Sequence, residues 1–159
     1  MPGDDRTAQD HGHSMFDRVV GQYARTRPGY PGDALDFLAA RAELAPGARV
    51  LDLAAGTGKL TASLVERGYE VTAVEPLPGM RAQLAHDLPE VDALDGRAEQ
   101  IPLAHGSVEL VCVGQAFHWF EPVPALDEIA RVLVPGGRLA LLWNLWDLDD
   151  PPQAALDAI

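Results

Sequence analysis

Apolar and polar positions alternate along the chain with two different periods. Short, mostly apolar runs predict strands at residues 49–54, 70–74, 91–94, 108–114 and 138–143. Apolar residues three or four positions apart predict helices at residues 33–43, 59–67, 79–88 and 124–133. In the last helix, Leu126, Ile129, Ala130 and Leu133 are expected to face the core. Because parallel neighbours need crossover connections, this alternation predicts an α/β fold with a doubly wound, mostly parallel sheet and helices on both faces.

The same pattern divides the chain into three parts. Residues 1–14 are polar and acidic, and we expect a flexible tail there. Residues 15–32 form a separate segment broken by Pro and Gly, and residues 33–159 form the folded domain. The N-terminus lacks the basic start and apolar stretch of a secretory signal, and no segment reaches the length of a membrane span. We therefore expect a cytoplasmic protein.

Composition and charge limit the partners. A chain of 159 residues that is 47% hydrophobic suits a single domain. Its formal net charge of -12 repels phosphate backbones and anionic lipids, so we expect neither nucleic acid nor a membrane as partner. The single cysteine, Cys112, lies in an apolar run and is expected to be a buried hydrophobic residue. His11 and His13 lack other ligand-type residues around them, so no metal is expected.

The strongest candidate chemistry lies where the first two strands end. Gly56 and Gly58 follow the first strand directly, and without side chains they allow a ligand to approach the backbone. Glu75 ends the second strand, nineteen positions after Gly56. A carboxylate in that place can accept hydrogen bonds from both hydroxyls of a ribose. The two features together predict a nucleoside site at the carboxyl edge of the sheet.

Other interpretations of the glycine loop differ in strength. The glycines can simply make a tight turn, with Glu75 as a solvated charge. A phosphate-binding P-loop is excluded, because it needs a glycine where this chain has Leu53. A dinucleotide fingerprint prefers a small residue at the position of Thr61. This weakens the interpretation as an NAD-dependent oxidoreductase, which nevertheless stays open.

Several segments in order resemble one family, the class I S-adenosylmethionine-dependent methyltransferases of the small-molecule type, with a methyltransferase-11-like domain. The resemblance covers residues 16 to about 147. The matching segments are FD (16–17), YARTRPGY (23–30), DLAAGTG (52–58), VEP (74–76) with Met80, GRAEQIP (96–102), QAFHWF (115–120) and LVPGG (133–137). It implies a Rossmann-like fold and S-adenosyl-L-methionine as cofactor.

The resemblance also implies roles for individual residues. Asp52, Gly56 and Gly58 would surround the methionine part of the cofactor, Glu75 would bind the ribose, and Gln115 would offer its backbone to the methionine amino group. The implied cofactor-binding residues are Asp52, Ala54, Gly56, Gly58, Glu75, Pro76, Met80, Ala98, Glu99 and Gln115.

Two positions depart from the family pattern. Many relatives have glycine where this chain has Ala54, and a methyl group there is expected only at negative φ. Many relatives also have an aspartate at the position of Arg97, so a hydrogen bond to the adenine amino group would come from Glu99 or from backbone, or would be absent.

Methyl transfer by in-line displacement requires alignment of the reactants more than a base or a metal. His118 is the candidate general base, because it follows the fourth strand and imidazole titrates near neutrality; the alternative is a residue that only lines the pocket. In similar enzymes the matching segment folds over the cofactor, so the resemblance implies that residues 15–32 form a lid. Candidate substrate or lid residues are Tyr23, Arg27, Tyr30 and Trp119.

Similar methyltransferases have seven strands in the order 3-2-1-4-5-7-6, whereas this chain supplies five. We therefore expect a partial chain that lacks the last two strands. The exposed apolar edge of the fifth strand would favour a homo-oligomer. Two functional alternatives stay open beside a methyltransferase acting on a small molecule: an S-adenosylmethionine-binding module without turnover, and the NAD-dependent oxidoreductase.

Overall fold

The structure is a computed structural model that describes residues 29–144. The tail at residues 1–14, Tyr23 and Arg27 lie outside these residues. The helices are α2 (Gly32–Ala42), α3 (Lys59–Val65), α4 (Pro78–Asp87) and α5 (Pro122–Val132), with a short 3-10 helix η1 (Phe117–Trp119). The strands are β1 (Arg49–Leu53), β2 (Glu70–Val74), β3 (Asp92–Leu94), β4 (Val108–Gly114) and β5 (Leu133–Leu142). The predicted alternation of strands and helices is confirmed, and η1 is an addition.

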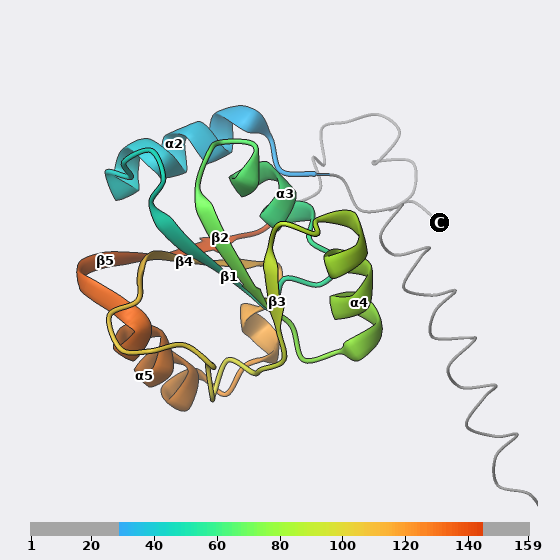
Figure 1. Cartoon of the computed structure of the whole chain (residues 1–159). Coiled ribbons are helices and arrows are strands. Elements are labelled where there is room, and N and C mark those ends of the chain that lie inside the picture. Colours follow the sequence, from blue (N-terminus) through green and yellow to red (C-terminus); the bar gives the residue numbers. More distant parts are fainter. Residues whose placement is uncertain (1–28, 145–159) are drawn as a thin grey trace, which may run out of the picture.

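The strands form one sheet in the order β3-β2-β1-β4-β5, and every neighbouring pair is parallel. Helices α2, α3 and α4 pack on one face of this sheet and α5 packs on the other (Figure 1). The predicted doubly wound α/β fold is therefore confirmed. The strand order reverses between β1 and β4, and this is where open parallel sheets bind ligands beyond their carboxyl ends.

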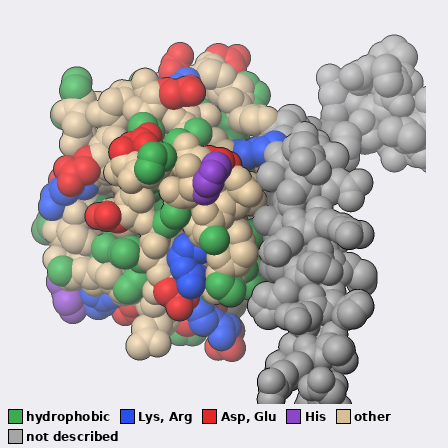
Figure 2. Space-filling view, turned by 45° about the vertical axis from the view of Figure 1, so that its right-hand side comes forward, with side chains coloured by type: hydrophobic (Ala, Val, Ile, Leu, Met, Phe, Trp, Pro, Cys, Tyr) green, Lys and Arg blue, Asp and Glu red, His purple; other side chains and the backbone are tan. Residues whose placement is uncertain are grey.

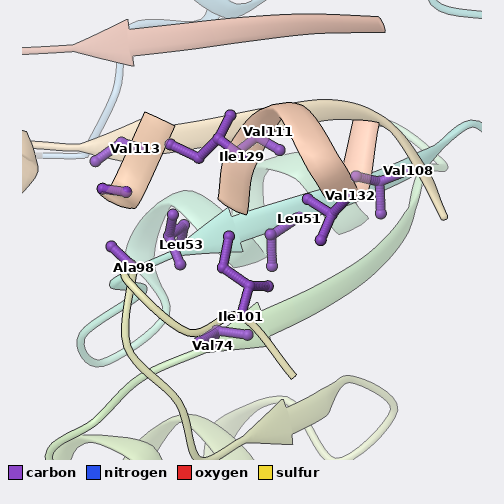
Figure 3. Packing of buried hydrophobic residues seen from close by; sticks show 11 residues of the cluster. Leu51, Leu53, Val74, Ala98, Ile101, Val108, Val111, Val113, Ile129 and Val132 are labelled. Carbon is purple, nitrogen blue, oxygen red and sulfur yellow. The ribbon is translucent and has the colours of Figure 1, made fainter. Parts of the chain in front are cut away.

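Two large apolar clusters hold the layers together. On one face, side chains of β1 and β4 such as Leu51 and Val111 contact Ile129 and Val132 of α5 (Figure 3). Ile101, from the loop between β3 and β4, packs in the same cluster. The other cluster lies under α2 and α3. It contains Leu35, Val50, Leu60, Leu64, Val71, Leu110, Cys112 and Ala140. Cys112 is fully buried as predicted, and burial raises the pKa of its thiol.

The orientation of α5 differs from the prediction. Its buried residues are Ala125, Ile129 and Val132, whereas Leu126 is 44% exposed and Ala130 is also exposed. The helix starts at Pro122, two residues earlier than expected, because proline is favoured in the first turn.

A polar pair also fixes that orientation. Glu128 accepts a hydrogen bond from the backbone N–H of Ile101 at 2.8 Å. Arg131 donates to the carbonyl oxygens of Ile101 and Leu103 and pairs with Glu128. These bonds tie one side of α5 to the loop that follows β3, and they leave Leu126 toward solvent.

Three observations concern the sheet edge, the surface charges and the helix lengths. Within residues 29–144, β5 pairs with β4 and has no strand on its other edge, so a homo-oligomer through that edge stays a prediction. On the face drawn in Figure 2, Lys and Arg side chains lie scattered among Asp and Glu side chains. In the same described range, no helix is long and apolar enough to cross a bilayer.

Candidate cofactor site

A cavity of about 580 Å³ opens at the carboxyl ends of β1, β2 and β4. This volume lies in the range of small-molecule sites, roughly 300–1,000 Å³. The lining residues come from the ends of β1 and β4, from the loops and helix starts that follow β1, β2 and β4, from the segment after β3, and from the segment before α2. They are Tyr30, Asp52, Leu53, Ala54, Ala55, Gly56, Thr57, Lys59, Leu60, Glu75, Pro76, Leu77, Met80, Gly96, Arg97, Ala98, Glu99, Gly114, Gln115, Ala116, Trp119 and Phe120.

The loop after β1 has three residues with left-handed backbone. Gly56 has φ 59° and Gly58 has φ 87°, as suits glycine. Ala54 has φ 59°, so the expectation of a negative φ at this alanine is wrong. A left-handed residue with a Cβ costs roughly 1–2 kcal/mol. Hydrogen bonds from Ala55 N–H to Val74 O and from Gly58 N–H to Ala55 O hold the bend in place.

Glu75 joins two of the loops that line the cavity. Its side chain is 4% exposed. One carboxylate oxygen accepts a hydrogen bond from Gly56 N–H and the other from Leu77 N–H, both at 2.9 Å. The predicted meeting of the glycine bend and this carboxylate is therefore present in the structure. Each carboxylate oxygen has a second lone pair for a further donor.

A second buried carboxyl group lies beside the first. Asp52 on β1 is 1% exposed and accepts a hydrogen bond of 2.6 Å from the hydroxyl of Thr61, which is fully buried in α3. Burial, with a smaller contribution from the charge of Glu75, raises the pKa of Asp52 to about 7, although the Thr61 bond acts in the opposite direction. Sequence reasoning considered Thr61 only as a poor third residue of a dinucleotide fingerprint. Its position in the first turn of the following helix was the available signal.

The segment after β3 closes one side of the cavity. Ala98 is buried, and Glu99 accepts a hydrogen bond from the backbone N–H of Glu121 at 2.9 Å. That bond, reinforced by the nearby Arg97, keeps the pKa of Glu99 below its usual range. Glu99 is therefore ionised and tied to the start of α5. Arg97 forms an ion pair with Glu99, with 3.6 Å between Arg97 Nε and Glu99 Oε2, and its side chain is largely exposed.

Most predicted site residues line this one cavity, including Tyr30 and Trp119. Two do not. Gly58 lies beneath the loop, where an added Cβ would stand 2.9 Å from Leu84 Cγ, so packing requires the glycine. His118 is exposed and is absent from the lining, and its ring lies beside that of Trp119, with centroids 4.8 Å apart and the ring planes tilted by 46°.

Sequence reasoning missed several lining residues. Lys59, Leu77, Gly114 and Phe120 lie in the cavity wall without having been singled out. At Gly114, an added Cβ would collide with the hydroxyl of Tyr30, so this glycine makes room for the tyrosine at the end of β4. Among residues 29–144, no group of three or more His, Cys, Asp and Glu side chains is arranged to hold a metal ion.

Comparison with known proteins agrees with this arrangement. Residues 51–141 match the family model described as a methyltransferase domain, which is more than half of the chain. The chain belongs to this family. The match begins in β1 and ends in β5, so it includes the loops that line the cavity.

Individual relatives support the same family. An uncharacterised methyltransferase of Mycobacterium tuberculosis is 54% identical over 132 residues, which are 83% of this chain and 53% of that protein. A demethylmenaquinone methyltransferase of Beutenbergia cavernae is 37% identical over 154 residues, 91% of this chain and 61% of that protein. The chain thus spans about half the length of the first of these relatives and three fifths of the second.

A solved structure confirms the fold at lower identity. It is a candidate S-adenosyl-L-methionine-dependent methyltransferase of Methanococcus maripaludis, with a TM-score of 0.71 and 18% identity. The likeness covers 99% of this chain and 73% of that one. The chain therefore has the fold of class I S-adenosylmethionine-dependent methyltransferases.

Proposed function

We propose that this chain is the cofactor-binding part of an S-adenosylmethionine-dependent methyltransferase that acts on a small molecule. The observation that carries the proposal is the buried Glu75 carboxylate bound to the backbone of the glycine loop at the edge of the cavity. Membership of the methyltransferase family supports it. When bound, S-adenosyl-L-methionine would supply an electrophilic methyl group for in-line displacement by the acceptor.

The residues of the cavity fit this cofactor chemically. The cofactor combines ribose hydroxyls, a flat aromatic adenine ring and positively charged sulfonium and ammonium groups. Glu75 and Asp52 are buried acidic groups, and a buried carboxylate is stabilised by a donor or a cation. Ala98, Met80 and Pro76 provide apolar wall. No covalent intermediate is needed for the reaction, so positioning of the two reactants accounts for much of the rate, roughly 7–11 kcal/mol in favourable cases.

Under this proposal each lining residue has a role. Glu75 would bind the ribose hydroxyls, and Ala98, Glu99 and Met80 would border the adenine. The methionine part would lie near Asp52, with the backbone of Gln115 toward its amino group. Gln115 has φ 57°, a strained value for a residue with a side chain, and such residues occur often at ligand sites.

The acceptor would enter past an apolar rim. Trp119 is 80% exposed and Leu77 is 41% exposed, and both line the cavity together with Phe120 and Tyr30. Exposed apolar side chains around an opening favour an apolar or aromatic acceptor. The demethylmenaquinone methyltransferase among the relatives agrees with a small-molecule acceptor. His118 stands next to this rim and remains our candidate base if the acceptor must lose a proton.

Calorimetric titration with S-adenosylhomocysteine tests the proposal. Glu75→Ala should weaken binding at least about tenfold, because hydrogen bonds to a charged group contribute roughly 1.5–3 kcal/mol. Glu90→Ala removes an equal charge at a residue outside the cavity lining and should leave the affinity unchanged. NAD, titrated in parallel, should not bind. Equal affinity in the wild type and Glu75→Ala, or binding of NAD in place of S-adenosylhomocysteine, would contradict the proposal.

Methyl transfer itself is tested separately. Methyl-labelled S-adenosylmethionine is incubated with the chain and a panel of small quinols, phenols and amines, and label in the organic products is counted. The proposal expects transfer to at least one acceptor and none with Glu75→Ala. Tight binding with no transfer to any acceptor would instead support a binding module without turnover.

A further inference from the structure

We propose that Thr61 is a positioning residue of this site: it orients the Asp52 carboxyl group so that a positively charged group of the cofactor binds there and displaces a proton. The inference rests on the proposed function, because it assigns the cation to the methionine part of S-adenosylmethionine. It adds a coupling between cofactor binding and proton release, and it gives a role to a residue outside the cavity lining.

The geometry of the pair carries the inference. Thr61 is fully buried in the first turn of α3, and its hydroxyl donates to Asp52 Oδ2 at 2.6 Å. Threonine is branched at Cβ and has few rotamers, so the buried hydroxyl holds a fixed direction. A hydroxyl has one proton to donate. Thr61 also donates its backbone N–H to the Asp52 carboxyl group, so one residue holds this group from two sides. The remaining lone pairs of the two oxygens are left for a ligand in the cavity that Asp52 lines.

The charged and titratable groups around Asp52 come from every neighbouring element. Glu75 directly follows β2, Cys112 lies opposite Asp52 in the register with β4, and Lys59 of α3 lines the same cavity. Tyr30, from the segment before α2, lines it as well. Cys112 stays a neutral thiol, because burial raises its pKa.

These surroundings leave Asp52 close to the balance between its two forms. Burial and the charge of Glu75 favour the carboxylic acid, whereas Thr61 favours the carboxylate, and the resulting pKa is about 7. Without a ligand, both the carboxylic acid and the carboxylate of Asp52 are therefore populated near neutral pH.

Binding of a cation shifts this balance in one direction. The O–H bond of the carboxylic acid breaks, the proton leaves to solvent, and the resulting carboxylate pairs with the cation, so the charge in the cavity balances. Below the pKa, affinity should fall by up to about tenfold for each pH unit, because the ligand must first expel a proton. Above the pKa, affinity should no longer depend on this group.

Calorimetry with S-adenosylhomocysteine, whose homocysteine part carries the same ammonium group as the methionine part of the cofactor, tests the inference. The wild type is titrated from pH 5.5 to 8.5 in two buffers with different ionisation enthalpies, which gives the number of protons released. We expect release of about one proton at pH 5.5, about half a proton at pH 7 and almost none at pH 8.5. Asp52→Asn should bind without proton release and with no dependence on pH in this range.

Thr61 variants separate positioning from mere packing. Thr61→Val has nearly the same shape but lacks the hydroxyl, so the proton-release profile should move to higher pH. Thr61→Ser keeps the hydroxyl and should restore the wild-type profile. If Thr61→Val does not fold, Thr61→Ala removes the same hydroxyl and should move the proton-release profile in the same direction.

Failure of the inference can be told apart from failure of the proposed function. Absence of S-adenosylhomocysteine binding at every pH would overturn the proposed function and the inference together. Binding by the wild type with no proton released at pH 5.5 would overturn the inference alone. An unchanged proton-release profile in folded Thr61→Val would remove Thr61 from its positioning role.

Discussion

Substitution of Gly58 by alanine probes how the glycine loop is packed onto the fold. Gly58 has φ 87°, and an added Cβ would stand 2.9 Å from Leu84 Cγ and 3.3 Å from Leu88 Cδ1. Leu84 is fully buried, so it cannot move aside easily. Gly68 supplies a matched control, because it has φ 80° and nothing within 4 Å of an added Cβ.

Both substitutions place an alanine at a positive φ, but only the alanine at position 58 crowds neighbouring side chains. A left-handed alanine costs roughly 1–2 kcal/mol at either position. Crowding of a packed core adds roughly 1–3 kcal/mol, and only at Gly58. We therefore expect Gly58→Ala to lower the free energy of unfolding by about 2–5 kcal/mol and Gly68→Ala by about 1–2 kcal/mol. Urea denaturation followed by circular dichroism measures both. Equal losses at the two positions would refute the argument from packing.

Two further substitutions test local features of the fold. Ala54→Gly should raise the free energy of unfolding by about 0.5–1 kcal/mol, because relief of the left-handed backbone outweighs the added freedom of the unfolded chain; a loss in the same urea assay would contradict this. The pKa of Glu128 is lowered to about 2, chiefly by its hydrogen bond from Arg131. Its stabilising contribution is present above the ordinary carboxyl pKa and is lost as the pH falls through about 2. The stability difference between the wild type and Glu128→Gln should therefore shrink between pH 6 and pH 2, and a constant difference would count against the role of this pair.

The parts of the molecule that sequence reasoning predicted are those encoded locally. Apolar runs marked all five strands, and alternation with helices implied parallel pairing. The start of β5 at Leu133, five residues before the predicted start, was missed, because the proline and glycines at 135–137 predict a turn there. The position of Glu75 relative to Gly56 followed from the same logic, because the carboxyl ends of adjacent parallel strands meet at one edge. Burial of Cys112 followed from the apolar run around it.

The parts that were missed depend on contacts between distant segments. The orientation of α5 is fixed by bonds from Glu128 and Arg131 to the loop at Ile101, and helical periodicity alone does not reveal such bonds. Ala54 has a positive φ in a bend that is bound to β2 by the hydrogen bond from Ala55 N–H to Val74 O. The intrinsic backbone preference of alanine does not predict this value. The hydrogen bond of the Thr61 hydroxyl exists only in the folded chain, where α3 brings this hydroxyl to Asp52.

A comparison of two ligands on two proteins tests the central claim most directly, namely that Glu75 binds the ribose of the cofactor. The affinities of S-adenosylhomocysteine and of its 2′-deoxy analogue are measured on the wild type and on Glu75→Ala. In the wild type, loss of the 2′-hydroxyl should weaken binding by roughly 10-fold to 150-fold, the equivalent of one hydrogen bond to a charged group. In Glu75→Ala, the two ligands should bind almost equally. The same loss in both proteins, or no loss in the wild type, would contradict the account.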